Sequence, residues 1–106
     1  MDKIIQGVPI YPGLVRGKVK KLDTEKSFKR PGKNEILVMK NLTPDITPLI
    51  LGAGAIVIEM GGMLTHGAIV ARELKIPCVS GIVNATSLLL DGQIIEVDGQ
   101  KGTVRY

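Results

Sequence analysis

Alternating hydrophobic and polar residues predict short strands near both ends of the chain. The alternation runs through Ile4–Val8 and through Leu14–Leu22, and a Tyr-Pro-Gly turn separates the two segments. Near the C-terminus, residues 93–97 and 103–105 alternate around a polar segment that contains two glycines. This pattern predicts that the chain ends in a β-hairpin.

Three further segments have the pattern of buried strands. They are Glu35–Met39, Ala55–Ile58 and Cys78–Ser80. Ala55–Ile58 is continuously apolar, which is typical of a strand that is covered on both faces. The polar residues 23–34 end in a Pro-Gly-Lys-Asn turn and are expected to connect two strands.

Short helices are predicted between these strands. A threonine N-cap, a proline at the first helical position and an early aspartate begin one helix at Thr43, and it extends to about Leu51. A second helix is predicted over Ala68–Leu74, and Asn84–Leu90 favours a short helix or turn. The apolar face of the second helix is expected to consist of Ile69, Val70 and Leu74. Strands and short helices in this order predict an α/β or α+β sandwich.

The composition favours one folded domain over residues 1–106. Hydrophobic residues make up 44% of the chain, as in folded proteins, and aromatic residues only 3%, so we expect an aliphatic core. No apolar stretch is long enough to span a membrane as a helix, and the start of the chain does not resemble a signal peptide. A soluble, cytoplasmic protein without a membrane partner is therefore expected.

Basic residues are concentrated in the first part of the chain. Residues 1–40 contain 10 Lys/Arg and 4 Asp/Glu, a net +6, whereas residues 41–106 contain 4 and 6, a net −2. A basic surface of this kind could bind an acidic partner. The basic segment lacks the interleaved aromatic side chains on which bases stack, so nucleic-acid binding is not expected.

The single histidine, His66, lies where a glycine-rich loop, residues 59–67, meets the predicted second helix. Unpaired amides and the helix dipole at such a position would stabilise a phosphoryl group, and they favour a neutral ring nitrogen that can attack phosphorus. Thr65 can cap the helix or hydrogen-bond the ring. Gly67 is expected to leave space beside the ring, so that valine there would slow transfer but cost only about 1 kcal/mol of stability. This pattern suits a nucleophilic histidine.

Simpler interpretations of His66 and its neighbours remain open on local sequence alone. His66 could be a partly exposed residue at a helix cap. Thr65 as the nucleophile would require a nearby base that is held by a third group. Arg72 fits a solvated helix face, although it could also reach a phosphate. Cys78 follows a proline in an apolar strand, which favours a buried and unreactive thiol.

A metal site is not predicted. The candidate partners of His66 would be Glu59, Asp45 and Asp98, and none of them has a recognised ligand spacing to the histidine. A single cysteine cannot form a cysteine-based zinc site by itself.

Residues 61–81, with the sequence GGMLTHGAIVARELKIPCVSG, closely resemble the phosphohistidine signature of the PEP-utilising enzymes. These include PEP synthase, pyruvate phosphate dikinase, enzyme I of the sugar phosphotransferase system and rifampicin phosphotransferase. The resemblance extends upstream to residues 7–13, 17–19 and 42–45, and downstream to residues 91–92 and 97–104. It therefore covers nearly the whole chain.

The resemblance implies a swivelling β/β/α three-layer domain whose histidine carries a phosphoryl group. His66 matches the carrier, Thr65 the hydroxyl position before it, and Arg72 the arginine on the following helix. The phosphate-binding loop would consist of Gly61, Gly62, Gly67 and Ala68. The family also implies two partners, an ATP-grasp domain and a PEP- or pyruvate-binding TIM barrel. These partners would hold Mg²⁺, ATP and PEP, so no cofactor is expected on this domain.

The chain departs from the family pattern in two ways. Many dikinases have a regulatory threonine two residues before the histidine, whereas this chain has Leu64, which is closer to the PEP synthase and rifampicin phosphotransferase branch. The ATP-grasp and PEP-binding domains are absent from the sequence, so the chain is either a separately encoded carrier or a domain cut from a longer chain. The start at Met1 and the lack of a tag favour the former. The alternative function is a regulatory or scaffolding module that retains the fold without catalysis.

Overall fold

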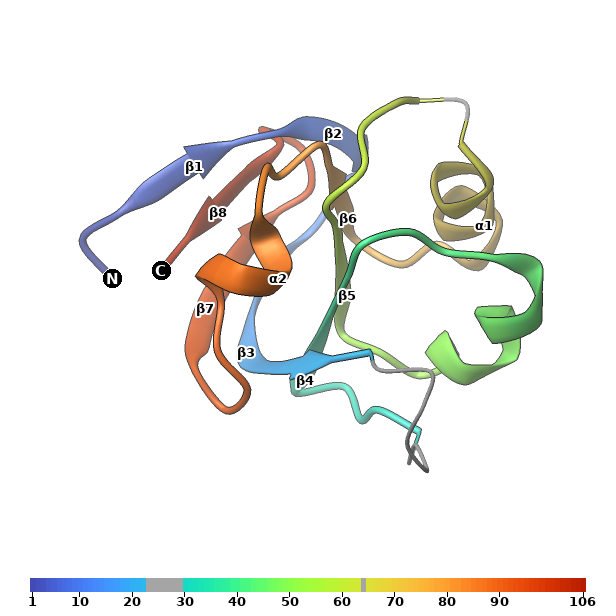
Figure 1. Cartoon of the computed structure of the whole chain (residues 1–106), viewed down its shortest axis with the longest axis horizontal. Helices are drawn as coiled ribbons and strands as arrows, with labels where there is room; N and C mark the ends of the chain where they lie inside the picture. The colour runs from blue at the N-terminus through green and yellow to red at the C-terminus, as the bar shows by residue number, and fades with distance from the viewer. Residues whose placement is uncertain (23–29, 64) are drawn as a thin grey trace.

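The computed structural model describes residues 1–22, 30–63 and 65–106. Within these residues, eight strands pair as one mixed sheet in the order β1-β8-β7-β3-β4-β5-β6-β2 (Figure 1). The strands are β1 (Ile4–Gln6), β2 (Val8–Tyr11), β3 (Leu14–Lys21), β4 (Glu35–Met39), β5 (Ala55–Ile58), β6 (Cys78–Ser80), β7 (Ile94–Asp98) and β8 (Thr103–Arg105). The helices are the 3-10 helix η1 (Pro44–Ile50), α1 (His66–Leu74) and α2 (Ala85–Leu88).

Two core clusters separate the molecule into three layers. The inner cluster lies between the two parts of the bent sheet, and the outer cluster lies between the sheet and the helices α1 and η1, whose arrangement Figure 1 shows. The inner cluster consists of Val19, Ile36, Val38, Ala55, Val57, Val79, Ile82, Ala85, Leu89, Ile95, Val97 and Val104. The outer cluster consists of Ile10, Leu37, Met39, Leu42, Ile46, Ile50, Ala53, Ile56, Ile58, Ala68, Val70, Ala71, Ile76 and Cys78. Alternate residues of β4 and β5 enter different clusters, so both strands are covered on both faces. This arrangement confirms the predicted mixed sheet with short helices and the aliphatic core.

The sheet is bent so strongly that its two outermost strands follow each other in the chain. Only Gly7 separates β1, which pairs with β8, from β2, which pairs with β6. The Gly7 amide donates to the Gly102 carbonyl at 2.7 Å, and a Cβ at Gly7 would lie 2.4 Å from the Ser80 carbonyl oxygen. The prediction of one continuous strand over Ile4–Val8 was therefore wrong, because the chain changes its pairing partner at this crowded glycine.

The parallel strands bring three connecting segments to one edge of the sheet. β3, β4, β5 and β6 pair in parallel, so the segments that follow β4, β5 and β6 leave from the same edge. Hydrogen bonds tie these segments together, because the Met60 amide donates to the Lys40 carbonyl at 2.9 Å and the Gly81 amide to the Met60 carbonyl at 3.4 Å. The predicted glycine-rich loop starts at this edge. Two parts of the predicted connections, residues 23–29 and 64, lie outside the described residues.

The predicted helix after Thr43 exists, but it is a 3-10 helix from Pro44 to Ile50. Pro48 lies inside it and has no amide hydrogen to donate to a carbonyl four residues earlier. Ile46 and Ile50 are buried in the outer cluster and hold η1 against the sheet.

Helix α1 is held against the sheet by small residues. It starts at His66, two residues earlier than predicted, and its buried residues are Gly67, Ala68, Val70 and Ala71. The predicted apolar face was wrong at Ile69 and Leu74, which are 44% and 37% exposed. Small side chains face the sheet because the helix lies too close to it for larger ones.

Gly67 marks the closest approach of α1 to the core. A Cβ at this position would lie 2.7 Å from Ile58 Cδ1 and 3.1 Å from Leu42 Cβ. The expectation that Gly67 leaves space beside the histidine ring was therefore wrong, because the missing side chain would point into the outer cluster. For the same reason we now expect valine at this position to cost more than the about 1 kcal/mol that the sequence suggested.

Helix α2 is attached to the end of β5 by Glu59. The Oε1 atom of Glu59 accepts hydrogen bonds from the amide of Thr86 at 3.0 Å and from the Thr86 hydroxyl at 2.9 Å. These hydrogen bonds favour the ionised carboxylate, so they lower the pKa of Glu59, and Lys40 lowers it further. Ala85 and Leu89 of this region are buried in the inner cluster.

Gly67→Val should destabilise the domain by about 2 kcal/mol, because a branched side chain overpacks the contact with Ile58 and Leu42. Gly32→Val is the matched control, since a Cβ at Gly32 meets nothing within 4 Å. Urea unfolding of both variants measures the difference. If Gly67→Val unfolds at the wild-type midpoint, the packing of α1 described above is incorrect.

The hydrogen bonds of Glu59 predict a pH-dependent contribution to stability. Its pKa is lowered in the folded state, so the contribution is present above the unfolded pKa of about 4.3 and is lost as the pH falls through the folded value. The stability difference between wild type and Glu59→Gln should therefore be larger at pH 7 than at pH 3. Chemical unfolding at both pH values measures this, and an equal difference at both would contradict it.

Candidate functional site

Thr65 is the N-cap of α1 and connects the helix to the glycine-rich loop. Its Oγ1 accepts a hydrogen bond from the amide of Ala68 at 3.3 Å and donates to the carbonyl of Gly62 at 3.3 Å. The Thr65 carbonyl accepts from the amide of Ile69 at 3.0 Å. The capping role expected of Thr65 is therefore confirmed, and its hydroxyl is already engaged in shaping the start of the helix.

His66 is the first residue of α1, and its side chain is exposed. The neighbouring residues Gly67 and Ala68 are buried, so the helix is fixed to the core directly behind the exposed ring. The amides of the first helical turn have no acceptor within the helix, and the helix dipole adds partial positive charge there. Because Thr65 caps the Ala68 amide, the amides of His66 and Gly67 are the better placed to receive an anion.

Thr47 of η1 approaches the ring of His66 and was not identified from the sequence. The distance between Thr47 Oγ1 and His66 Nε2 is 3.1 Å, and η1 follows β4 at the edge of the sheet where α1 begins. The resemblance in this region extends only to residue 45, and no local sequence pattern relates Thr47 to His66, because the two residues lie on different helices.

Arg72 holds the glycine-rich loop from within α1. Its Nη1 donates to the carbonyl of Met63 at 2.7 Å, and its side chain is half-buried. The loop also depends on Gly62, whose φ of +127° is open to glycine but not to residues with a side chain. Gly61 packs against Gly81, because a Cβ at Gly61 would lie 3.4 Å from the Gly81 Cα. The Arg72 guanidinium has five N–H donors, so the hydrogen bond to the Met63 carbonyl leaves other N–H groups that could bind an anion.

Cys78 is buried in the outer cluster and is no nucleophile. Burial raises the pKa of its thiol to about 12, and the charge of Arg72 opposes this increase only in part. The thiol is therefore protonated at neutral pH, which confirms the prediction of a buried, unreactive cysteine.

The acidic residues considered as metal ligands are dispersed and have other partners. Glu59 binds Thr86, Asp45 accepts from the Thr43 hydroxyl, and Asp98 accepts from two amides of the β7–β8 turn. Within the part of the chain that the structure describes, no three His, Cys, Asp or Glu side chains are grouped to hold a metal ion.

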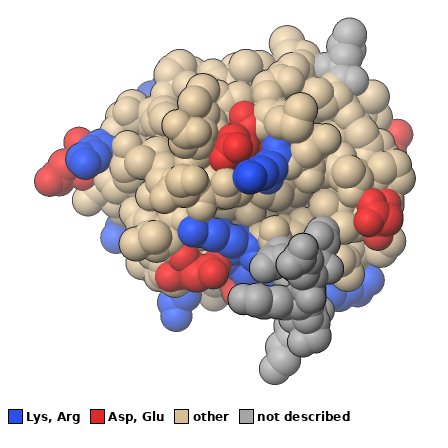
Figure 2. All heavy atoms as spheres, viewed as in Figure 1, with Lys and Arg blue, Asp and Glu red and all other residues tan. Residues whose placement is uncertain are grey.

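Charged side chains on the viewed face of the molecule are mixed in sign and lie among uncharged surface (Figure 2). On the sheet, Arg16 is opposite Glu96 in the register of β3 and β7, and Glu96 is opposite Arg105 of β8. Glu96 thus lies between Arg16 from the first part of the chain and Arg105 from its end.

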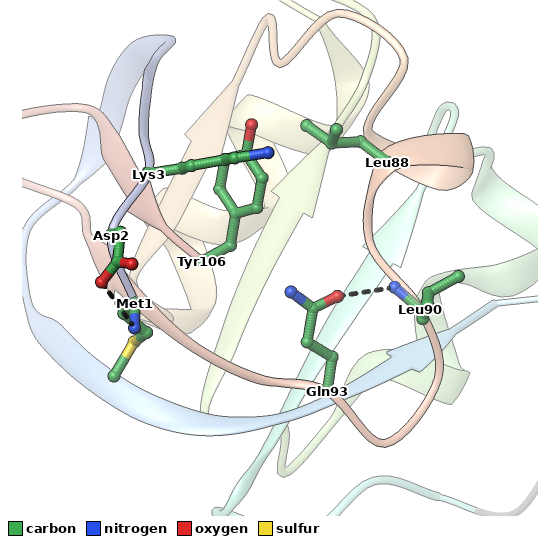
Figure 3. Close-up of a pocket in the computed structure, with 7 residues that line it drawn as sticks. All are labelled: Met1, Asp2, Lys3, Leu88, Leu90, Gln93 and Tyr106. Carbon is green, nitrogen blue, oxygen red and sulfur yellow. Dashed lines mark hydrogen bonds and ion pairs between the residues drawn. The ribbon is translucent and has the colours of Figure 1, made fainter.

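A shallow hollow lies away from His66, near the two chain ends (Figure 3). It is lined by Met1, Asp2, Lys3, Leu88, Leu90, Gln93 and Tyr106. Its polar groups are largely engaged, because Gln93 Oε1 accepts from the Leu90 amide at 3.0 Å and Asp2 lies 3.8 Å from the terminal amino group. The hollow contains no residue of α1 or of the glycine-rich loop, so we do not assign the site to it.

Among the described residues, no helix combines the length and apolar character that crossing a membrane requires.

Comparison with known proteins matches residues 31–102 to the family model of the PEP-utilising enzyme mobile domain. The chain is 46% identical over 104 residues to a phosphoenolpyruvate synthase of Aeropyrum pernix, which covers 97% of this chain and 13% of that protein. It is 41% identical over 101 residues to a rifampicin phosphotransferase of Bacillus cereus, which covers 94% of this chain and 11% of that protein. The chain thus spans only about an eighth of the length of these relatives.

A solved structure supports the same relationship. The solution structure of an Enzyme I protein superimposes with a TM-score of 0.60 and 30% identity, covering 77% of this chain and 33% of that one. The relatives carry the matching segment as one part of a much longer protein. These matches confirm the resemblance that the sequence around His66 predicted, and the chain belongs to the family of PEP-utilising enzyme mobile domains.

Proposed function

We propose that this chain is a phosphoryl-carrier domain in which His66 accepts a phosphoryl group from one partner and passes it to another. The observation that carries the proposal is the exposed imidazole at the first residue of α1, in front of helix amides and on a helix fixed to the core. Membership of the mobile-domain family supports the same role.

The chemistry would take place at a ring nitrogen of His66. The lone pair of the neutral imidazole attacks phosphorus, an N–P bond forms, and the bond from phosphorus to the leaving oxygen breaks. The leaving group keeps the electron pair, and the ring keeps its proton on the other nitrogen. Attack by the acceptor on phosphorus reverses these steps and returns the neutral ring. Such a transfer depends on positioning and charge stabilisation, which a small domain can provide.

The residues around His66 have distinct parts in this proposal. The amides of His66 and Gly67 would receive phosphoryl oxygens, as anions at helix N-termini do. Thr65 maintains the start of the helix, and Arg72 maintains the loop through the Met63 carbonyl. A free N–H of Arg72 could in addition neutralise charge on the phosphoryl group. Gly61, Gly62 and Ala68 contribute through the backbone shape of this segment.

The partners follow from the length of the relatives. Since the chain spans about an eighth of the PEP synthase it matches, the nucleotide and PEP sites would lie on other domains or subunits. We propose an ATP-grasp partner that holds ATP and Mg²⁺, and a PEP- or pyruvate-binding TIM-barrel partner. The similarity to a rifampicin phosphotransferase indicates that acceptors differ within the family. The chain itself would bind no cofactor and act in the cytoplasm as the phosphotransfer component.

His66→Ala should abolish phosphorylation of the chain. Incubation with the ATP-grasp partner and ATP that is labelled in both its β- and γ-phosphates should give wild type an acid-labile, base-stable label at one phosphoryl group per chain. Glu73→Gln, an exposed change on the same helix, is the matched control and should label like wild type. Equal labelling of His66→Ala would refute the carrier role, and a wild type that no partner phosphorylates would favour the scaffolding alternative.

The purified chain alone should neither hydrolyse ATP nor consume PEP, because its partners would hold both substrates. Phosphate release and PEP consumption should stay at the level of the His66→Ala sample over hours. Saturable turnover that grows with chain concentration would contradict the assignment of both substrate sites to partners.

A further inference from the structure

Exposed apolar side chains lie on the segments that lead into and out of His66. Among the described residues, Met60 and Met63 of the glycine-rich loop are 54% and 53% exposed, and Ile69 of α1 is 44% exposed. Ile69 follows His66 by three residues in the helix, so the two side chains are neighbours on its surface. The loop leads from β5 to the start of α1 (Figure 1). We call Met60, Met63 and Ile69 the apolar patch.

The backbone beneath the apolar patch is held in place by hydrogen bonds. Arg72 Nη1 donates to the Met63 carbonyl at 2.7 Å, and Thr65 Oγ1 donates to the Gly62 carbonyl at 3.3 Å. The amide and carbonyl of Met60 are bonded to the segments that follow β4 and β6. These contacts use main-chain atoms of the loop, so both methionine side chains are left at the surface.

The surface around His66 carries few charges. Residues 60–71 contain no Asp, Glu, Lys or Arg, although such residues make up 23% of the chain. Charged residues stand at both ends of this segment, with Glu59 before it and Arg72 and Glu73 after it. An uncharged apolar centre between charged borders is the usual composition of a protein–protein interface. The patch therefore suits an uncharged, apolar partner surface better than an acidic one.

The position of the patch indicates which partner covers it. In the proposed transfer, phosphorus must come within about 3.5 Å of a ring nitrogen of His66 before the N–P bond forms. A protein that brings the phosphoryl group this close lies over Ile69, which is one helical turn from the ring, and over the adjoining loop. The relatives contain the matching segment within a protein about eight times as long, so a protein surface of this size is available to them.

We propose that Met60, Met63 and Ile69 form the docking surface for the protein that donates the phosphoryl group, and that the facing surface of this donor is uncharged and apolar. The inference rests on the carrier function proposed above and adds the chemistry of the interface. Methionine side chains are unbranched and flexible, so they can adjust to the surface of the donor. The basic residues of the first 40 positions have no part in this docking.

Substitutions with both signs of charge test the docking surface. The probe is the full-length phosphoenolpyruvate synthase of Aeropyrum pernix with its own carrier histidine replaced by alanine, supplied with ATP labelled in its β- and γ-phosphates. Met60→Glu, Met63→Glu and Ile69→Glu should raise the chain concentration that gives half-maximal labelling about tenfold, with the maximal rate unchanged. Met63→Lys should have the same effect, because either charge is costly against an apolar surface. If Met63→Lys is labelled like wild type or faster, the donor surface is acidic and the proposal is overturned.

Two controls separate docking from chemistry. Leu90→Glu changes an exposed apolar residue in the hollow near the chain ends and should leave the half-maximal concentration within about twofold of wild type. Phosphoramidate, a small donor that needs no docking, should label Met63→Glu and wild type at rates within about twofold of each other. If phosphoramidate labels Met63→Glu as slowly as the protein donor does, the substitution disturbs the histidine itself, and the docking role is refuted.

Titration of the ¹⁵N-labelled chain with the same probe measures docking without transfer. The amide signals of Met63 and Ile69 should shift or broaden, and that of Leu90 should not. If these amides respond but wild type is not labelled, the transfer fails and the docking surface stands. If wild type is labelled but the patch variants behave like it, docking fails and the carrier function stands. A probe that neither labels the chain nor affects these amides refutes the docking surface. Self-association of wild type that Met63→Glu abolishes would assign the patch to a second copy and overturn the proposal.

Discussion

The candidate site depends on the close contact between helix α1 and the sheet at Gly67. A Cβ there would lie 2.7 Å from Ile58 Cδ1, so only a glycine lets the first turn of the helix approach the core this closely. Ala68 and Ala71 continue the contact along the helix. The exposed His66 is consequently attached to a helix that packs tightly against the core, although its own side chain is exposed to solvent. The contact of Gly67 with the core therefore buries the helix behind the ring and leaves the ring itself exposed.

The parallel strands supply the second constraint, because they deliver every part of the site to one edge of the sheet. β4 leads into η1 and Thr47, β5 leads into the glycine-rich loop, and β6 leads into Gly81 beside that loop. Arg72 then ties the loop back to α1 through the Met63 carbonyl. The carrier function proposed above would require a ring that is presented to different partners without being reshaped by either of them. A loop that is fixed at both ends would suit this requirement.

Much of the fold could be predicted because local patterns matched it. The apolar runs at β4, β5 and β6 and the C-terminal hairpin were found from periodicity and turn residues.

The wrong predictions concern segments whose structure is determined by contacts between residues distant in sequence. The break of the first strand at Gly7 follows from contacts with Gly102 and Ser80, which are distant in sequence. Ile69 resembled a core residue, yet it is exposed because small residues face the sheet. Thr47 was missed for a related reason, since its approach to His66 depends on how two helices meet in space.

In the carrier function proposed above, the amides at the start of α1 would receive the phosphoryl group on His66. The most direct test treats the ¹⁵N-labelled chain with phosphoramidate, a small phosphoryl donor that needs no partner, and follows the backbone amides by nuclear magnetic resonance. We predict one phosphohistidine signal in the ³¹P spectrum, with downfield shifts of the His66 and Gly67 amide protons, because each would donate a hydrogen bond to a phosphoryl oxygen. Phosphorylation of His66 that leaves these two amides unshifted would contradict the account.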